Sequence, residues 1–324
     1  MNTKSDVASA ADAVKRTLRN RAARFPDRTD IRNRVFPDWV EKGRSHNMLQ
    51  PAIAPSFKIP RESSVFTIGS CFARNVENYL MEEGVKVPAS VYRVPEGEVR
   101  GGVNRVLNQY NPGSMAQAVH FASQPVHYEG IIETGSGSVD LLLSTGTNPV
   151  TPERARERRE EIHTLYRTSI EQAATVIITL GLIEAWFDRE TGLWLNEMTV
   201  GHARSSGDRY EFHQIGVDEC TQLVSRMIRE LGDKNIVLTV SPVPLQTTFT
   251  GQDCVTANAV SKATLRIAAD RVCKQFSNVD YYPSYEMVTS LGDTGIGNDN
   301  VHVRNYVVQH VVRYMLNQYL ERTD

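Results

Sequence analysis

The stretch SVFTIGSCFARNVENYLMEEG, residues 64–84, decides the fold class of this 324-residue chain. An apolar run over residues 64–68 ends at Gly69, and a helix is predicted over residues 71–83, closed by Gly84. A strand that turns directly into a helix is the first half of a βαβ unit. Such units build parallel sheets.

The same alternation recurs toward the C-terminus. Residues 175–180 (TVIITL) and 235–240 (NIVLTV) are continuous apolar and β-branched runs, typical of strands buried on both faces of a parallel sheet. We therefore expect an α/β domain with a mostly parallel sheet of about five strands and helices on both faces. The remaining predicted elements are a helix from Pro152, helices over 217–231, 256–276 and 303–320, and a strand over 279–282.

Three segments depart from this pattern. Residues 1–50 hold eleven Lys and Arg against six acidic residues, and are expected to form a basic helical arm. A linker around residues 50–55 then leads into the main domain, residues 55–324. Within it, residues 186–216 are expected to be an irregular insertion outside the main sheet, with a hairpin around Trp194.

Composition excludes several classes of protein. The chain has 36 Lys and Arg against 38 Asp and Glu, which argues against a dedicated nucleic-acid binder. No apolar run is long enough for a membrane span, and the N-terminus lacks the apolar segment of a secretory signal. Four scattered cysteines without a CxxC pair predict no disulfide framework and no metal site, so we expect a cytoplasmic protein without cofactor.

The helix from Pro152 is strongly charged. Four arginines alternate with four glutamates between residues 153 and 161, an arrangement typical of an exposed helix with i,i+4 ion pairs. We expect this face to be solvated rather than to bind an anion.

Candidate catalytic residues lie where parallel strands end, because chemistry in open α/β sheets sits outside the carboxyl ends of the strands. Ser70 follows the first strand, and Asp299 and His302 stand just before the last helix. A serine hydroxyl becomes a nucleophile when a histidine accepts its proton, and a carboxylate fixes the tautomer of that histidine. The helix after Ser70 offers amide groups and a positive dipole to an oxyanion.

The sequence resembles a known family at this point. Thr67-Ile68-Gly69-Ser70-Cys71-Phe72-Ala73 is similar to the signature of the GSCFA domain, and further matches run in the family's order from about residue 55 to 305. They are Tyr110-Asn111-Pro112, Thr179-Leu180-Gly181 with Glu184 and Trp186, Ser241-Pro242-Val243-Pro244, and Tyr282-Pro283-Ser284-Tyr285-Glu286. The resemblance implies a flavodoxin-like three-layer sandwich related to SGNH (GDSL-type) hydrolases, with Ser70 as nucleophile and His302 and Asp299 completing a triad.

The block that would complete the oxyanion hole differs from the wider superfamily. Gly181-Leu182-Ile183-Glu184 stands in place of Gly-x-Asn-Asp and contains no asparagine. Asn111 either supplies a side-chain donor instead or is a turn residue before Pro112. Glu184 either orients a substrate hydroxyl or caps a following helix. Trp186 either stacks on a sugar ring or packs in the core.

Cys71 is a rival nucleophile because it begins the helix after Ser70, where a thiolate is stabilised. The competing interpretation, which we favour, makes it a small residue facing the helix–sheet interface.

Three functions remain open. The first is hydrolysis of an acyl ester on a small molecule or carbohydrate, and the second is O-acyl transfer to a sugar with the same triad. The third is a non-catalytic domain that binds a carbohydrate or a partner. The acyl group, the acceptor and the oligomeric state do not follow from the sequence.

Overall fold

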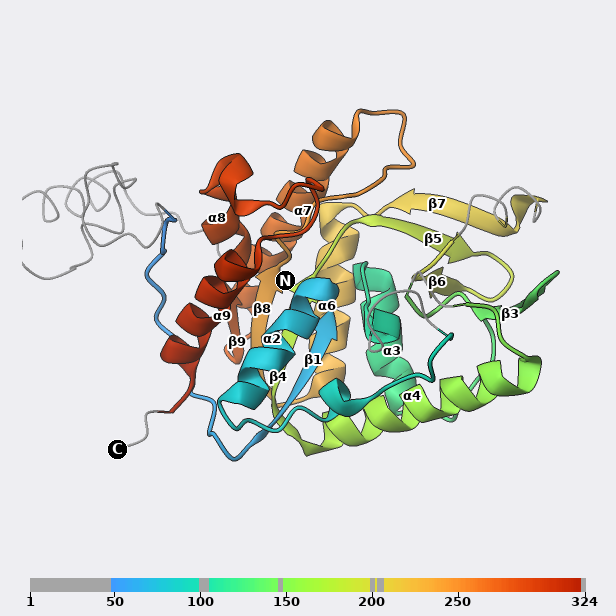
Figure 1. Cartoon of the computed structure of the whole chain (residues 1–324), viewed down its shortest axis with the longest axis horizontal. Coiled ribbons are helices and arrows are strands. Elements are labelled where there is room, and N and C mark those ends of the chain that lie inside the picture. The colour runs from blue at the N-terminus through green and yellow to red at the C-terminus, as the bar shows by residue number, and fades with distance from the viewer. Residues whose placement is uncertain (1–47, 99–104, 145–147, 199–201, 203–206, 322–324) are drawn as a thin grey trace, which may run out of the picture. The chain divides into compact units, whose positions relative to one another are not determined.

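A computed structural model describes residues 48–98, 105–144, 148–198, 202 and 207–321. Its centre is a four-stranded sheet in the order β1-β4-β8-β9, in which every neighbouring pair is parallel (Figure 1). The strands are β1 (Ser64–Gly69), β4 (Ala173–Leu180), β8 (Asn235–Val240) and β9 (Val279–Tyr282). The sequence-based prediction of a parallel α/β sheet is confirmed.

The expected fifth strand is reduced to one residue. Lys86 forms a single parallel bridge with Ser64 at the free edge of β1, and Val65 N–H donates to the Lys86 carbonyl at 2.8 Å. With this bridge counted as a strand, the spatial order is 2-1-3-4-5, the doubly wound order of flavodoxin-like folds. Lys86 lies two residues before Pro88, which begins a 3₁₀ helix and ends the extended segment.

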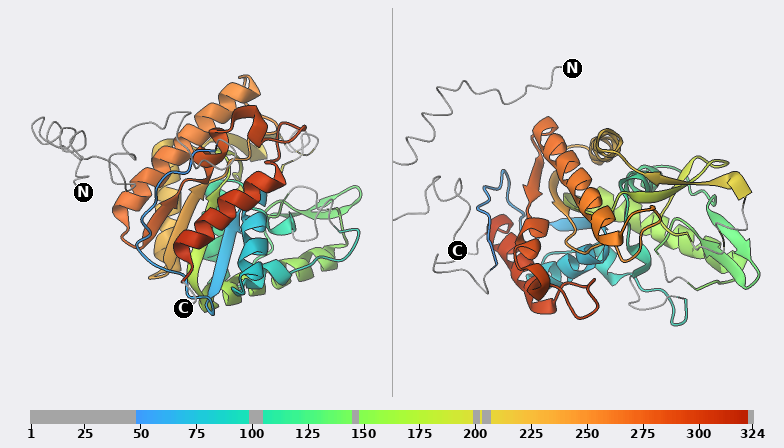
Figure 2. Two further views of the ribbon diagram at one scale, coloured as in Figure 1. Left: turned by 60° about the vertical axis from the view of Figure 1, so that its left-hand side comes forward. Right: turned by 90° about the horizontal axis from the view of Figure 1, so that it is seen from above.

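Helices cover both faces of the sheet. On one face α2 and α9 pack together, and on the other α3, α6 and α7 lie side by side (Figures 1 and 2). The helices are α2 (Cys71–Glu82), α3 (Pro112–Ala122), α4 (Pro152–Gln172), α6 (Val217–Leu231), α7 (Cys254–Gln275), α8 (Ser284–Thr289) and α9 (Asn305–Tyr319). Short 3₁₀ turns are η3 (Pro88–Val91), η4 (Arg105–Leu107), η5 (Gly207–Arg209) and η6 (Gly292–Gly295). No helix in the described part of the chain is both long and apolar enough to cross a bilayer.

The core follows from the apolar runs. Seven of the eight residues of β4 are buried, since helices cover both of its faces. The buried positions of α6 recur at helical spacing, and Gly232 ends the helix as predicted. Both apolar patterns contribute to one hydrophobic core, whose burial drives folding.

The predicted insertion lies outside the central sheet as expected, but the prediction that it is irregular is wrong, because its described residues form a small antiparallel sheet that begins at Glu184. Its order is β6-β5-β7, from β5 (Glu184–Asp188), β6 (Leu193–Leu195) and β7 (Tyr210–Gln214), and the hairpin at Trp194 is confirmed. A separate hairpin joins β2 (Ile131–Thr134) to β3 (Gly137–Asp140). The predicted arm, residues 1–50, lies outside the described residues except for its last three, and it stays a prediction.

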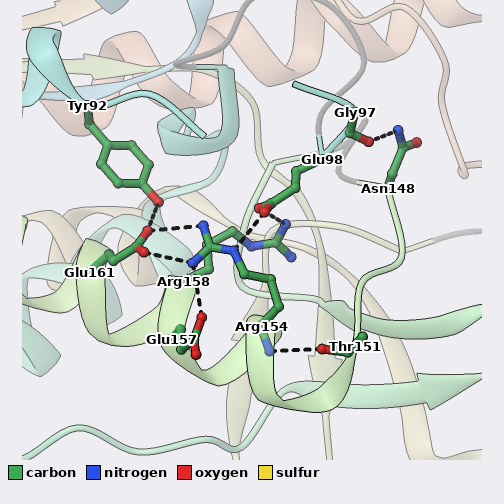
Figure 3. Close-up of polar contacts among 9 residues, drawn as sticks. All are labelled: Tyr92, Gly97, Glu98, Asn148, Thr151, Arg154, Glu157, Arg158 and Glu161. Atoms are coloured by element: carbon green, nitrogen blue, oxygen red, sulfur yellow. Dashed lines mark hydrogen bonds and ion pairs between the residues drawn. The ribbon is translucent and has the colours of Figure 1, made fainter. Parts of the chain in front are cut away.

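The prediction of a solvated face on α4 is wrong for two arginines. Arg158 is fully buried and contacts Glu98 at 3.4 Å, while Arg154 binds the other oxygen of Glu98 at 2.6 Å (Figure 3). Arg154 also binds Glu161 at 2.7 Å, and Glu161 in turn accepts from Tyr92. Charged residues do alternate along α4, but the partner of Arg154 and Arg158 is Glu98, which lies in a loop far away in sequence.

Arg159 is the second buried arginine. Its guanidinium holds Asp140 with two hydrogen bonds, Nε to Oδ2 at 2.8 Å and Nη2 to Oδ1 at 2.5 Å. Its Nη1 donates to the carbonyls of His127 and Glu129. This fork attaches the β2–β3 hairpin to α4.

Glu98→Gln should lower the free energy of unfolding by about 3 kcal/mol, because it leaves the buried Arg158 without an anionic partner. Urea unfolding at neutral pH measures the change. Glu157→Gln is the matched control, since Glu157 approaches Arg154 on the same helix but its side chain is 65% exposed. Equal stabilities of the two variants would contradict the role given to Glu98.

Candidate active site

A cavity of about 270 Å³ opens at the carboxyl ends of the central strands. Ser70 follows β1, Gly181 follows β4 and Ser241 follows β8, and all three line it. The insertion contributes Trp186 and the segment before α9 contributes His302. Four segments distant in sequence therefore meet at the edge where the fold class places its chemistry.

Ser70 stands on a tight turn between β1 and α2. Gly69 before it has φ +150°, and a Cβ there would lie 2.4 Å from the Thr179 carbonyl oxygen. Ser70 occupies the N-cap of α2, but its hydroxyl makes no capping bond and donates to Ser241 Oγ at 3.1 Å. In the first turn of α2 the Ala73 amide donates to the Ser70 carbonyl at 2.8 Å, which leaves the amides of Cys71 and Phe72 without an intrahelical acceptor.

Asp299 and His302 form a pair in a small turn. His302 Nδ1 donates to Asp299 Oδ2 at 2.5 Å, which leaves Nε2 unprotonated in the neutral ring. Asp299 Oδ1 accepts the amides of His302 and Val301 at 3.0 and 3.1 Å. These bonds, that of the imidazole foremost, hold the pKa of Asp299 far below its usual range. Asn300 between them has φ +57°, which lets the chain reverse.

Ser70 and His302 line the same cavity, but among the described residues no hydrogen bond joins them. The sequence-based prediction placed Ser70 within hydrogen-bonding reach of His302. Instead, the hydroxyl of Ser70 points to Ser241, and the His302 side chain is 68% exposed. The expected direct contact is therefore absent in this structure.

Cys71 also lines the cavity and is only partly buried, which corrects the expectation that it faces the helix–sheet interface. Burial raises the pKa of its thiol, and the charges of Arg105 and Lys262 oppose this only in part. A thiol with a raised pKa is a poor thiolate nucleophile at neutral pH. The local chemistry thus favours Ser70 over Cys71.

Asn111 lies on the cavity wall as the N-cap of α3. Its Oδ1 accepts from Ser114 N–H at 2.8 Å, and its Nδ2 donates to the Leu195 carbonyl at 3.1 Å. The residue starts the helix before Pro112, in line with the turn interpretation. One amide hydrogen is already engaged, which limits what it can offer to an oxyanion.

Glu184 does not have the helix-capping role weighed from the sequence, and its contact with a substrate hydroxyl stays a prediction, since it lines the cavity. It begins a strand, so no helix follows it to be capped. Its Oε1 accepts from the Thr248 hydroxyl at 2.7 Å, and its Oε2 from Phe249 N–H at 2.8 Å. Both oxygens hold the loop that closes one side of the cavity, so Glu184 shapes the site through that loop.

Trp186 combines its two alternatives, because it packs on aromatic neighbours and still faces the cavity. Its ring contacts Phe249 edge-on, with centroids 5.3 Å apart, and Phe212 at 5.5 Å. All three side chains line the cavity. They form an apolar wall of the kind that receives the face of a ring-shaped ligand.

Two further residues that line the cavity, Asn196 and Arg105, were not predicted from the sequence. Asn196, in the insertion, accepts from Tyr110 N–H at 2.9 Å and donates to the Asn108 carbonyl at 2.8 Å. Arg105 is exposed. Neither falls in a motif or a periodic segment, and only proximity to the Tyr110-Asn111-Pro112 block could have drawn attention to Arg105.

A clamp from α7 fixes the turn after β4. Lys262 Nζ donates to the Gly181 carbonyl at 2.7 Å, and Ile183 N–H donates to Ser261 Oγ at 3.1 Å. Leu182 N–H donates to the Tyr110 carbonyl at 2.9 Å. A Cβ on Gly181 would lie 2.5 Å from that same carbonyl oxygen. The floor of the cavity therefore depends on a lysine that is 1% exposed.

The buried lysine should make stability depend on pH. Burial lowers the pKa of Lys262 to about 7, whereas an unfolded lysine keeps its proton to about pH 10.4. Between these values the unfolded chain binds more protons, so stability rises with pH. The wild type should therefore gain up to about 1.4 kcal/mol per pH unit over Lys262→Met above about pH 7.

Urea unfolding between about pH 6 and pH 9.5 measures this difference, which should be flat below about pH 7. Lys234→Met is the matched control, because Lys234 also donates to a strand carbonyl, that of Ala173, but is only half-buried. Parallel curves for wild type and Lys262→Met across the range would contradict the prediction.

The fold and the cavity define a class, an α/β protein with a doubly wound parallel sheet and a Ser, His and Asp set at its carboxyl edge. No group of three or more His, Cys, Asp and Glu in the described ranges could hold a metal ion. The GSCFA family model matches residues 64–315, and the chain belongs to the GSCFA family.

One solved structure is similar at 15% identity with a TM-score of 0.35, over 82% of this chain and 100% of the other. It is a variant of an acetyl-xylooligosaccharide esterase from Geobacillus Stearmophilus. No curated protein sequence matches.

Proposed function

We propose that the protein is a serine esterase that removes a short acyl group from a carbohydrate ester, with Ser70 as nucleophile, His302 as base and Asp299 as its orienting carboxylate. One observation carries the proposal. Ser70 and His302 line one cavity at the carboxyl edge of the sheet, and Asp299 binds the ring nitrogen that the base does not need. This division of the two nitrogens is what a general base requires.

The reaction has two halves. The Ser70 oxygen attacks the acyl carbonyl as its proton passes to His302 Nε2, and the imidazolium then protonates the leaving sugar oxygen. Water next attacks the acyl-enzyme and loses a proton to His302. The imidazolium returns this proton to the Ser70 oxygen as the bond between the acyl carbon and that oxygen breaks, and the acyl group leaves as the carboxylic acid. Since Asp299 accepts from Nδ1, it stabilises the imidazolium formed in both halves.

Productive geometry requires Ser70 to exchange its bond to Ser241 for one to His302, whose side chain lines the same cavity and is 68% exposed. Catalytic hydrogen bonds are often long before substrate binds and tighten in the complex. The positive end of α2 and its first amides then face the developing oxyanion.

A panel of short acyl esters, with and without sugar acceptors, tests the proposal. Release of acid without an acceptor supports hydrolysis, and a fluorophosphonate should label Ser70. An acyl product formed only with an acceptor sugar would replace hydrolysis by transfer through the same acyl-enzyme. Inactivity on every ester together with an unlabelled Ser70 would leave a binding protein.

A further inference from the structure

The cavity lining includes a guanidinium, that of Arg105, which has no partner among the described residues. Arg105 is exposed at the start of η4 and lines the cavity together with Ser70. Within the described residues its side chain makes no hydrogen bond or ion pair. Among the described residues that line the cavity, it is the one Lys or Arg. The other cavity-facing ionic groups are committed to neighbours.

The carboxylate that lines the cavity already has hydrogen-bond partners in the protein. Among the described residues that line the cavity, Glu184 is the one with a carboxylate. Both of its oxygens accept hydrogen bonds from the Thr248–Phe249 segment. Asp299, nearby, accepts from His302. A ligand in the cavity therefore meets one cation, Arg105, that has no partner in the described chain, and no carboxylate that lacks a partner there.

A buried lysine lies beneath the floor. Lys262 donates to the Gly181 carbonyl, and no carboxylate of the described chain pairs with it. Because burial lowers its pKa to about 7, Lys262 is only partly charged at neutral pH. Arg105 is therefore the fixed positive charge among the described residues of the cavity lining, and a positive charge there favours an anionic ligand.

We propose that the cavity selects carbohydrate esters bearing a carboxylate on the sugar, with Arg105 as the specificity-determining residue that pairs with this carboxylate. The planar guanidinium matches a carboxylate with two parallel hydrogen bonds. The wall of Trp186, Phe212 and Phe249 lines the same cavity and gives the sugar ring an apolar surface to pack against. The inference rests on the proposed function for the ester, but recognition of the carboxylate is a matter of binding.

Binding is measured with Ser70→Ala, which retains the cavity and cannot turn the ester over. The probes are methyl 3-O-acetyl-α-D-glucopyranosiduronate and methyl 3-O-acetyl-α-D-glucopyranoside, which differ at C6 by carboxylate against hydroxymethyl. The uronate should bind about tenfold more tightly at low salt. Arg105→Gln in the same background should bring the ratio of the two dissociation constants to near one, and added salt should reduce it.

Arg226→Gln is the matched control, an exposed arginine on α6 that pairs with Glu230 and lies outside the cavity lining. It should keep the ratio of the Ser70→Ala parent. Equal binding of the two probes by Ser70→Ala, or a ratio that survives Arg105→Gln, would overturn the proposal. Circular dichroism of each variant excludes misfolding as the cause of a lost ratio.

A further experiment tests whether the recognised carboxylate is on the sugar or on the acyl group. Mono-(4-nitrophenyl) succinate and 4-nitrophenyl butyrate carry the difference on the acyl group instead of the sugar. A preference for the succinate with no preference between the two sugars would overturn the assignment to the sugar.

The two proposals fail differently. If wild type hydrolyses both acetyl sugars with equal kcat/KM and Ser70→Ala binds them equally, the carboxylate inference fails and the esterase stands. If no ester is cleaved but the Arg105-dependent ratio persists, the esterase fails and carboxylate binding stands.

Discussion

Ser70→Ala should lower acyl-ester turnover by about 10⁴-fold or more and abolish labelling by a fluorophosphonate. Without the hydroxyl no acyl-enzyme forms, and only binding and oxyanion stabilisation remain. Asp299→Asn should cost about 10⁴ in kcat, because the amide reverses the tautomer and presents a proton to the serine. Since the three residues act as one unit, the Ser70→Ala/His302→Ala double variant should be scarcely slower than Ser70→Ala. Steady-state kinetics on an activated ester measures each rate.

Two neighbouring substitutions serve as controls. Cys71→Ala should keep most of the turnover, because the raised pKa of Cys71 leaves the thiol protonated. Ser241→Ala removes the acceptor that holds the Ser70 hydroxyl in the ligand-free state, and should leave labelling of Ser70 intact. Full activity of Ser70→Ala with loss of activity in Cys71→Ala would transfer the nucleophile to the cysteine.

Gly69→Ala should lower the free energy of unfolding by about 3–5 kcal/mol, because two costs combine. An alanine is strained at φ +150°, and its Cβ would lie 2.4 Å from the Thr179 carbonyl oxygen and 2.7 Å from Thr179 Cβ. Thr179 belongs to β4 and is paired with Gly69 across the ladder, so it has no room to withdraw. Urea unfolding measures the loss, and turnover should fall further because the turn also aims Ser70.

Gly135→Ala is the matched control. Gly135 lies between β2 and β3, its added Cβ would meet nothing within 4 Å, and its φ is ordinary. It should change stability by less than about 1 kcal/mol. If Gly69→Ala and Gly135→Ala lowered the free energy of unfolding by similar amounts, backbone strain and the contact with Thr179 would not explain why position 69 requires glycine.

Much of the candidate site was accessible from the sequence because the sheet edge collects the residues that follow its strands. Ser70, Gly181 and Ser241 all come directly after apolar runs, and they line one cavity. Asp299 and His302 are three residues apart, so one turn suffices to join them. The distance between His302 and Ser70 has no such local determinant, and the expected bond between them is absent in the described structure.

Consecutive residues were enough to predict the four strands, their parallel arrangement and the helices α2, α4, α6, α7 and α9, because hydrophobic periodicity and helix ends are local patterns. The helices α3 and α8 and the order of the strands were not predicted and came only from the structure. Only the tertiary structure decided the roles of Glu184, Arg158 and Lys262. Each takes its role from a partner tens of residues away: the loop at Thr248, the segment at Glu98 and the carbonyl of Gly181. The residues next to a polar side chain in the sequence do not indicate which distant group it will contact. Desolvation and hydrogen bonding, which decide what it does, exist only once the chain has brought the two together.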